Sequence, residues 1–532
     1  MQTLKLLDCT LRDGGFINDW EFGHDTMTSI LERLVDSGVE VIEVGFLDER
    51  RDYDINRSIM PDTESVQRIF GNIDKGNALI VGMIDYGTCS IARLQPCNES
   101  YLDGIRVIFK KHDMYKAIDY CRQIKKLGYK VFTQLVSITS YSKEELLEMI
   151  GLVNDLSPYA LSIVDTYGLL HQDHLSDIFD IMDTNLNSQI GIGYHAHNNF
   201  QMGYANCIKM LHKQVERTIL VDATLYGMGK SAGNAPIELV GMYMNENFGK
   251  RYDVHQMLEA IEINIMDIYH KIPWGYNLFY YIAAANKCHP SYVSYLMNKR
   301  TLSIKSINEV LKDIESEKKL LYNKEHIEAL YLQYQQAECN DEDAFRLLSN
   351  ELKDRELLLI GPGKSVLSDS DKIKKYINLH QPIVVSINYL PNSFTPQYLF
   401  ITNSKRYAQM ATKLCEANYN AIKTIATSNV TKTKGRFSYV LNYSSLIDAE
   451  TEIPDNSLIM LLKTIEKVGV KKVGLAGFDG YSESEMNYFN TNMEYSFAKE
   501  KAQYLNNYAK NFLHDYKNRM IFEFVTKSYY EV

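Results

Sequence analysis

Eight short apolar runs, spaced at near-regular intervals, mark the first 240 residues of the chain. Each run is rich in β-branched residues and precedes a segment long enough for a helix, as in residues 26–37, 114–127 and 143–156. Eight strands with helical connections predict a (β/α)8 TIM barrel of the α/β class, because a doubly wound sheet would have fewer strands over this span. The predicted strands are residues 4–7, 39–45, 78–84, 104–109, 130–136, 160–165, 190–195 and 218–223.

Polar and charged side chains follow these strands at their carboxyl ends. In a TIM barrel this face carries the chemistry, so their positions support both the fold and a catalytic role. The residues concerned are Arg12, Asp13, Glu43, Asp85, Gln134, Asp165, His195, His197 and Asp222.

The pair His195 and His197 closes the seventh predicted strand and indicates a metal site. Residues i and i+2 of a strand point to the same side, so both imidazoles can reach one cation. Asp13, after the first strand, would add a carboxylate. Two nitrogens and one oxygen, with positions left open, suit a catalytic divalent metal. We expect Mn²⁺ or Mg²⁺, with Zn²⁺ or Co²⁺ as alternatives, although His-x-His pairs also occur on exposed strands.

Four residues are predicted to be catalytic: Arg12, Glu43, Asp165 and Tyr167. Arg12 places a permanent positive charge where an oxyanion could develop, and the alternative is a surface salt bridge. Glu43 would orient Arg12 from inside the barrel, or would be a satisfied core acid. Asp165 and Tyr167 belong to an Asp-Thr-Tyr-Gly sequence at the catalytic rim, which could also be only a tight turn.

A glycine-rich loop over residues 222–234 leads from the last strand to a helix. It could be a flexible connection and nothing more. Its length and position instead indicate close approach of the backbone to a substrate, with amide N–H groups facing it. Asn234 would then lie near the metal, and we include it among the predicted ligands.

Bulk properties exclude several classes of protein. A net charge of −10 argues against sequence-independent binding of nucleic acid. No apolar stretch is long enough to span a membrane, and the N-terminus runs into a strand without room for a signal peptide. The eight cysteines are scattered without a Cys-x-x-Cys pair, which predicts reduced thiols and a cytoplasmic protein.

A chain of 532 residues should contain two or three domains. The strand rhythm ends near residue 240, and residues 255–271 and 306–319 are predicted helices. Residues 340–343 look like a helix N-cap region. We therefore expect a barrel over residues 1–290, a helical extension of it over residues 291–352, and a separate α/β domain over residues 353–532.

The C-terminal domain has its own strand pattern, typical of a mostly parallel, Rossmann-like sheet. Its first predicted strand leads into Gly361-Pro-Gly363-Lys364-Ser365, which lacks the Walker spacing but could present backbone amides to a phosphate. The alternative is a plain turn between strand and helix. Asn388 also follows a strand, where open sheets bind ligands. The predicted strands are residues 356–360, 383–388, 398–402, 421–426 and 472–476.

This arrangement resembles, over a short stretch, bacterial sialyltransferase-like domains that bind a cytidine nucleotide. The resemblance implies a nucleotide or nucleotide-sugar site that includes Gly361, Gly363, Lys364, Ser365 and Asn388. It further implies that the chain serves surface-glycan synthesis.

The N-terminal motifs resemble, in the same order, those of the DRE-TIM metallolyase superfamily, which includes 4-hydroxy-2-oxovalerate aldolases, hydroxymethylglutaryl-CoA lyase and isopropylmalate synthases. The resemblance covers about residues 3–290, and the ending Ala-Gly-Asn-Ala-Pro-Ile-Glu is most similar to the aldolases. The motifs are Leu-Asp-Cys-Thr-Leu-Arg-Asp-Gly (7–14), Ile-Glu-Val-Gly-Phe (42–46), Asp-Thr-Tyr-Gly (165–168), His-Ala-His-Asn-Asn (195–199) and Gly-Lys-Ser-Ala-Gly-Asn-Ala-Pro-Ile-Glu (229–238).

The resemblance implies a divalent metal bound by Asp13, His195 and His197, with Asn234 close to it. Arg12 would stabilise an enolate during reversible aldol chemistry between a 2-oxo acid and an aldehyde. Barrels of this superfamily commonly pair, so a homodimer is expected.

One departure from the family pattern concerns the general base. The aldolases carry a histidine shortly after Arg-Asp-Gly, whereas residues 14–18 here are Gly-Gly-Phe-Ile-Asn. His24, His112, Tyr167, Tyr226 or a metal-bound water are the alternatives. Two other functions remain open, an acyl-CoA-dependent Claisen-type synthase and a non-catalytic barrel scaffold.

Overall fold

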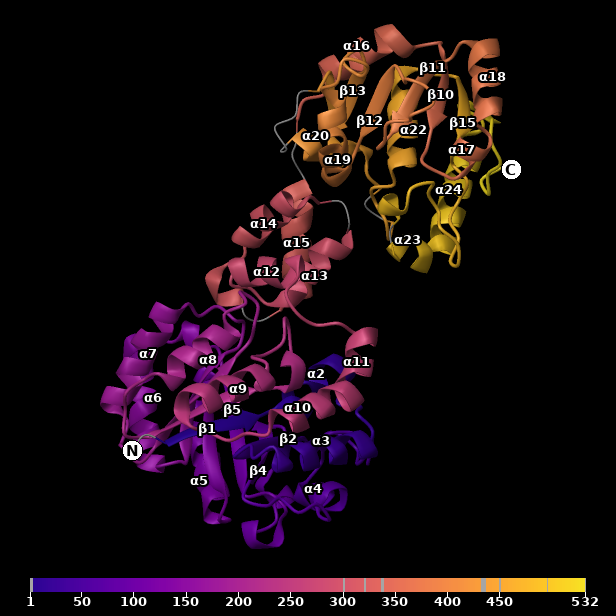
Figure 1. The fold of residues 1–532 in the computed structure, drawn as a ribbon. Helices are drawn as coiled ribbons and strands as arrows, with labels where there is room; N and C mark the ends of the chain where they lie inside the picture. Colours follow the sequence, from indigo (N-terminus) through magenta and orange to yellow (C-terminus); the bar gives the residue numbers. More distant parts are fainter. Residues whose placement is uncertain are drawn as a thin grey trace. The chain divides into compact units, whose positions relative to one another are not determined.

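The computed structural model divides into two compact units, Met1–Pro290 and Ser291–Val532 (Figure 1). It describes residues 3–299, 302–319, 322–335, 339–431, 437–448, 451–494 and 496–531. Within these ranges, no helix combines the length and apolar character needed to cross a bilayer.

The first unit is a closed barrel of eight parallel strands, as predicted. Strand β1 pairs with β9 on one side and with β2 on the other, and these two pairings close the sheet. All eight predicted strands are present with boundaries shifted by at most a few residues. They are β1 (Thr3–Asp8), β2 (Val41–Leu47), β4 (Leu79–Asp85), β5 (Gly104–Phe109), β6 (Lys130–Leu135), β7 (Ala160–Asp165), β8 (Gly191–Ala196) and β9 (Thr218–Ala223).

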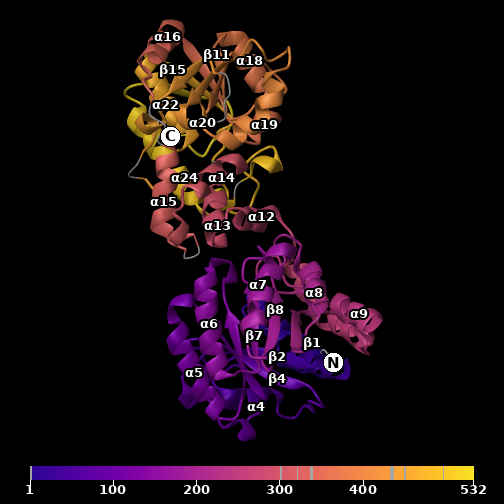
Figure 2. The ribbon, with the colours of Figure 1, turned by 90° about the vertical axis from the view of Figure 1, so that its left-hand side faces the viewer.

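Helices surround this barrel, and Figure 2 shows α4, α5 and α6 outside the strands. Their apolar faces pack on outward-facing strand residues such as Leu6, Ile42 and Ile80. The helices of the unit are α1 (Thr10–Asp13), α2 (Gly15–Asn18), α3 (His24–Asp36), α4 (Thr63–Phe70), α5 (Met114–Lys126), α6 (Lys143–Leu156), α7 (Gln172–Asn185), α8 (Gly203–Leu211), α9 (Ile237–Phe248), α10 (Val254–Ala260), α11 (Met266–Lys271) and α12 (Leu278–Ala285).

The barrel interior changes from apolar to polar along the strand direction. Alternate strand residues face inward, and an apolar cluster that includes Leu7, Val41 and Leu220 fills the interior near the start of the strands. Two residues further along β2 and β9, the inward positions are Glu43 and Asp222, both fully buried. The interior therefore has an apolar layer near the start of the strands and a charged layer toward their carboxyl ends.

A bulge in β2 gives this strand an irregular course. The register with β4 shifts between Glu43 and Phe46, and a short strand β3 (Ile59–Met60), which was not predicted, pairs with the end of β2. Gly45 has a φ of +147°, and a Cβ on it would lie 1.9 Å from the carbonyl oxygen of Ser58. Only glycine fits this position without a backbone shift.

The helical predictions after the barrel need two corrections. Residues 255–271 are helical, but α10 and α11 are joined by a π-helical turn, η6 (Ile261–Ile265). Residues 306–319 were predicted as one helix, whereas α14 (Ile304–Lys312) ends at Lys312 and a 3₁₀ turn, η7 (Ser316–Lys318), follows. Apolar periodicity cannot reveal either change in hydrogen bonding.

The helices of residues 291–352 belong to the second unit. Ser303 N donates to Ser404 Oγ over 3.3 Å, and Asn442 N donates to the carboxylate of Asp341 over 2.9 Å. The predicted helix start near residue 341 is confirmed. The helices here are α13 (Pro290–Lys299), α14, α15 (Lys324–Gln335) and α16 (Glu342–Leu352).

The second unit is built on a seven-stranded sheet in which every pairing is parallel, with the strand order β14-β13-β12-β11-β10-β15-β16. The five predicted strands are present, and the short β14 and β16 were missed. Two apolar clusters pack on its opposite faces. The strands are β10 (Glu356–Ile360), β11 (Ile383–Ile387), β12 (Tyr398–Ile401), β13 (Lys423–Thr427), β14 (Tyr439–Leu441), β15 (Lys472–Ala476) and β16 (Ile521–Phe524).

Helices cover both faces of this sheet (Figure 1). Residues of α16, α22 and α24 contribute to one apolar cluster, and residues of α18 and α19 contribute to the other. The helices are α17 (Ser365–Ser368), α18 (Ser370–His380), α19 (Ser404–Leu414), α20 (Ser428–Thr431), α21 (Tyr443–Leu446), α22 (Ser457–Val468), α23 (Ser496–Glu500) and α24 (Ala502–Tyr516).

The bulge yields a stability prediction. Gly45→Ala should lower the free energy of unfolding by about 2–4 kcal/mol, because the new methyl group meets backbone and φ is unfavourable for alanine. Gly249→Ala is the matched control, since Gly249 also has a positive φ, +65°, but has open space around it. Its cost should be about 1 kcal/mol. Chemical denaturation measures both values, and equal losses would contradict the role assigned to the Ser58 contact.

Candidate metal centre and active site

Asp13, His195 and His197 converge at the carboxyl end of the barrel. Nε2 of His195 lies 3.9 Å from Oδ1 of Asp13, and Nδ1 of His197 lies 3.9 Å from Oδ2 of Asp13. All three side chains are at least 95% buried. Their potential ligand atoms lie within 4.8 Å of one another, so the three residues could hold one metal ion.

The two imidazole nitrogens that face Asp13 have no hydrogen-bond partner in the described structure. Nε2 of His195 and Nδ1 of His197 are both buried and unsatisfied. Burying an unpaired polar atom costs free energy, so such atoms at one point indicate a missing partner. Two imidazoles and a carboxylate form a donor set that suits a divalent cation.

The protonation states of these groups also suit a metal. Burial lowers the pKa of His197 to about 3, so this imidazole is neutral near pH 7. Burial alone would raise the pKa of Asp13, but Arg12 and the two histidines outweigh it, and the pKa lies below its usual value. The carboxylate is therefore ionised while His197 keeps a free lone pair.

Asn234 positions the Asp13 carboxylate. Its Nδ2 donates to Oδ2 of Asp13 over 2.6 Å, and its own Oδ1 is buried without a partner. Lys230 N also donates to Oδ2 of Asp13, over 3.1 Å. A Cβ on Gly229 would lie 1.9 Å from Nδ2 of Asn234, so the glycine of this loop permits the close approach that the sequence indicated.

Arg12 lies beside the metal-ligand candidates and is not a surface salt bridge. Its Nη1 donates to Oδ1 of Asp13 over 2.5 Å, and its Nε donates to Oε2 of Glu43 over 2.7 Å. Glu43 is therefore both the inward carboxylate that orients Arg12 and a fully buried acid. Burial lowers the pKa of Arg12, but Glu43 and Asp13 more than reverse this, so the guanidinium stays charged.

A buried arginine, Arg106 on β5, extends this network and was not anticipated from the sequence. It donates to Oε2 of Glu43 over 3.0 Å, to Oε1 of Gln134 over 3.2 Å, and to the carboxylate of Asp222. A single arginine in the apolar strand Gly104–Phe109 was the available signal. Arg106 links the two buried acids across the barrel interior.

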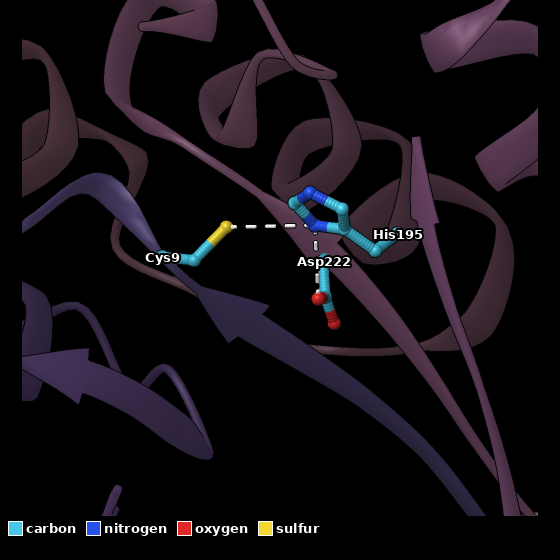
Figure 3. A group of neighbouring side chains, drawn as sticks. All are labelled: Cys9, His195 and Asp222. Atoms are coloured by element: carbon cyan, nitrogen blue, oxygen red, sulfur yellow. Dashed lines mark hydrogen bonds and ion pairs between the residues drawn. The ribbon is translucent and has the colours of Figure 1, made fainter. Parts of the chain in front are cut away.

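Asp222 fixes the orientation of His195. Figure 3 shows that its carboxylate and the Cys9 thiol both approach Nδ1 of His195, at 3.1 and 3.9 Å. Cys9, His195 and Asp222 also satisfy the distances of a metal site. Nδ1 is hydrogen-bonded to Asp222, which also accepts a hydrogen bond from Arg106. Asp222 therefore orients the imidazole ring so that Nε2 faces Asp13.

The segment after β7 places Asp165 and Tyr167 at the rim. Both oxygens of Asp165 accept backbone N–H groups, from Leu169 over 2.8 Å and from Leu170 over 3.0 Å. Burial raises the pKa of Asp165 to about 6. These bonds give Asp165 a defined role in shaping the turn, while Tyr167 is half-buried in the same segment.

Three of the residues considered in place of the family's histidine base have contacts with acidic or aromatic side chains. His24 lies 3.6 Å from Asp25, and His112 lies 3.1 Å from Asp113. The ring of Tyr226 packs edge-on against Tyr269, with centroids 5.1 Å apart.

The segment that lacks the histidine contributes an aromatic wall instead. Phe16 packs edge-on against Trp20 and Phe46, with ring centroids 4.9 and 6.1 Å apart. The ammonium of Lys230 lies 5.1 Å from the centre of the Phe16 ring. Burial lowers the pKa of Lys230. The Asp13 carboxylate opposes this shift, and the Arg12 charge adds to it. Lys230, which the sequence did not single out, is therefore a second cation near Arg12.

Of the five residues predicted to bind a nucleotide in the C-terminal domain, two line the same cavity and three have other contacts. Gly363 and Asn388 line one cavity of the second unit. Ser365 donates its backbone N–H to Asp479 over 2.8 Å, and Lys364 Nζ donates to Glu485 over 3.1 Å. Gly361 N donates to Ala476 O over 2.8 Å.

Known proteins with similar sequences are aldolases. 4-Hydroxy-2-oxovalerate aldolase 6 of Rhodococcus jostii is 25% identical over 264 residues, which cover 49% of this chain and 73% of the aldolase. The 4-hydroxy-2-oxovalerate aldolase of Chloroflexus aurantiacus is 27% identical over 278 residues, which cover 50% of this chain and 77% of that protein.

A solved structure and a family model are also similar to this chain. The N-terminal domain of a candidate aldolase from Bacteroides vulgatus superposes with a TM-score of 0.48 and 23% identity, over 57% of this chain and 99% of that one. Residues 3–264 match the family model described as HMGL-like. The first unit of this chain belongs to the HMGL-like family, the superfamily of aldolases and lyases that its motifs resemble.

Proposed function

We propose that the barrel catalyses the reversible aldol cleavage of a 4-hydroxy-2-oxo acid, with a divalent cation held by Asp13, His195 and His197. The observation that carries this proposal is the pair of unpartnered imidazole nitrogens that face one carboxylate. The names of the similar aldolases supply the reaction class.

The cation, when bound, supplies Lewis-acid polarisation of a ketone oxygen and charge neutralisation for a carboxylate. Arg12 supplies a fixed positive charge beside it. Since Nε and Nη1 are held by Glu43 and Asp13, the guanidinium cannot rotate away, and Nη2 takes no part in either bond. A donor fixed in this way stabilises negative charge on an oxygen without reorganisation during the reaction. Lys230 adds a cation suited to an anionic substrate.

The cleavage needs no oxidant and no acyl carrier. A proton leaves the 4-hydroxyl group, the electron pair of the C3–C4 bond moves toward the ketone oxygen, and an aldehyde departs. The resulting enolate then takes a proton at C3 to give the 2-oxo acid. The candidates for the base that takes the proton of the 4-hydroxyl group are those that the sequence offers, namely His24, His112, Tyr167, Tyr226 and a metal-bound water. The homodimer expected from the resemblance stays a prediction.

Exchange of the pyruvate methyl protons tests this function. With Mn²⁺ and pyruvate in D₂O, the full chain should catalyse metal-dependent incorporation of deuterium, because enolate formation reverses at the methyl carbon. Proton NMR measures the loss of the methyl signal. Exchange with acetyl-CoA only would instead favour a Claisen-type synthase, and no exchange with no bound metal would favour a scaffold.

Removal of a ligand candidate tests the metal site. His195→Ala should weaken metal affinity by about 100-fold or more, since a lost ligand costs at least as much as a lost supporting residue. Elemental analysis after dialysis measures the bound metal. His212→Ala is the control, because His212 is exposed and contacts Tyr243. Unchanged metal content in His195→Ala would reject the ligand role.

Substitution of Arg12 separates metal binding from charge stabilisation. Arg12→Lys should keep the metal but lose about 100-fold or more of the exchange rate, because a point charge cannot replace the planar donor held by Glu43 and Asp13. Arg33→Lys is the control, since Arg33 pairs with Glu259 on the surface. A rate in Arg12→Lys equal to that of the control would remove Arg12 from the mechanism.

A further inference from the structure

The second unit contains a cavity of about 490 Å³ at the carboxyl end of its sheet. Loops that follow four different strands line it, through Gly363 after β10, Asn388 after β11, Thr402 after β12 and Asp479 after β15. The volume lies in the range of small-molecule sites.

The cavity lies where the order of the sheet reverses. Strand β10, the first of the unit, has β11 on one side and β15 on the other. The chain after β10 leads to α18 on one face of the sheet, and the chain after β15 leads to α24 on the other face. Both connections contribute to the lining, through Gly363 and Asp479. Open parallel sheets bind their ligands at such a switch point.

The glycine turn beside the cavity is not a free phosphate cradle. Gly363 N donates to Gly477 O over 2.8 Å, and Ser365 N donates to Asp479 Oδ2 over 2.8 Å. A Cβ on Gly363 would lie 2.6 Å from the Gly477 oxygen. The glycine lets two loops pack together, and the Asp479 carboxylate already occupies the place of an anion.

A set of amide and hydroxyl groups lies on the opposite side of this turn. Asn388, in a left-handed backbone conformation with φ +57°, donates to Thr402 Oγ1 over 3.0 Å and to Ser457 Oγ over 2.8 Å. Thr402 N donates back to Asn388 Oδ1 over 3.0 Å. These bonds hold the polar groups of three elements in fixed positions on the cavity wall.

The cavity also combines carboxylates with aromatic rings. Asp455 lies near Tyr443, whose hydroxyl donates to it over 3.4 Å, and burial raises the pKa of Asp455. Tyr481 and Tyr488 line another part of the wall, with ring centroids 6.3 Å apart at an angle of 86°. Asp479 completes the acidic lining.

The basic residues of the lining already have acidic or carbonyl partners. Lys501 lies 2.6 Å from Glu452, Lys299 lies 3.9 Å from Glu328, and Arg406 donates to the carbonyl oxygen of Met493 over 2.5 Å. The lining carries four carboxyl groups, those of Glu328, Glu452, Asp455 and Asp479, against these three basic groups, so it offers no excess of positive charge to a free phosphate.

We propose that this cavity binds a ring compound with several hydroxyl groups, of the sugar or nucleoside class. A carboxylate such as that of Asp455 accepts hydrogen bonds from the hydroxyl groups of a ligand, as do the hydroxyl oxygens that Asn388 positions. Tyrosine rings pack on the apolar face of a sugar or on a base. The proposal concerns the second unit alone and does not depend on the aldolase activity of the barrel.

Calorimetric titration of the full chain tests the proposal. The probes are glucose, N-acetylglucosamine, cytidine, uridine and adenosine, each alone, with UDP-glucose, CMP and inorganic phosphate as further arms. Binding of at least one sugar or nucleoside is the expected result. Absence of binding by all of these neutral probes at about 5 mM, near the weak limit of specific affinity, would overturn the proposal. So would binding of inorganic phosphate as strong as that of CMP.

A pair of variants locates the site. Asp455→Asn should weaken the binding of the positive probe by about 10-fold or more, because a hydrogen bond to a charged acceptor is lost. Asp371→Asn, on the exposed side of α18, should leave it unchanged. Equal affinities in both variants would exclude Asp455 and the proposed location.

Hydrogen exchange on the unmodified chain gives an independent readout in case Asp455→Asn does not fold. The positive probe should slow amide exchange in residues 451–458 and 477–481, which border the cavity. Protection confined to the barrel would overturn the assignment, and it would leave the aldolase proposal to its own test of pyruvate exchange.

Discussion

The active site depends on a chain of buried charges that crosses the barrel interior. Arg12 binds Glu43, Glu43 binds Arg106, Arg106 binds Asp222, and Asp222 binds Nδ1 of His195. Each of these side chains is at least 95% buried. Isolated charges at such depth would be prohibitive, whereas alternating signs with direct hydrogen bonds offset the desolvation. The same network thus sets the position of Arg12, which is proposed to stabilise an oxyanion, and that of His195, a candidate metal ligand.

The strand alternation explains why this network can exist inside a barrel. Inward positions along β2 pass from Val41 to Glu43, and along β9 from Leu220 to Asp222. A step of two residues along each strand therefore leads from the apolar layer of the interior to the charged layer. The apolar layer excludes water from the interior next to these charges, and the low local dielectric makes each charge interaction stronger. Loss of one member would leave its neighbours unpaired, which is costlier than loss of an exposed ion pair.

The sequence predicted those features that local pattern determines. All eight barrel strands and the five inner strands of the second unit follow from apolar runs. The approach of His197 to Asp13 follows from strand ends that share one face. Arg106 and Lys230 were missed because their roles depend on partners far along the chain. The π-helical turn was missed because it changes hydrogen bonding and not the apolar pattern. Strands β14 and β16 lie at the two edges of the sheet, and they were missed because β14 has three residues and none of the four residues of β16 is buried.

The two units use the carboxyl ends of parallel strands in different ways, and glycine loops show the difference. In the barrel, Gly229 allows Asn234 and Asp13 to come together at the site. In the second unit, Gly363 instead packs against the Gly477 loop, and the amide of Ser365 is taken by Asp479. The local sequences look equally suited to a ligand. They differ because Asp479, more than a hundred residues away in sequence, already occupies the glycine turn of the second unit. The proposed ligand site therefore lies beside this turn, near Asn388 and Asp455.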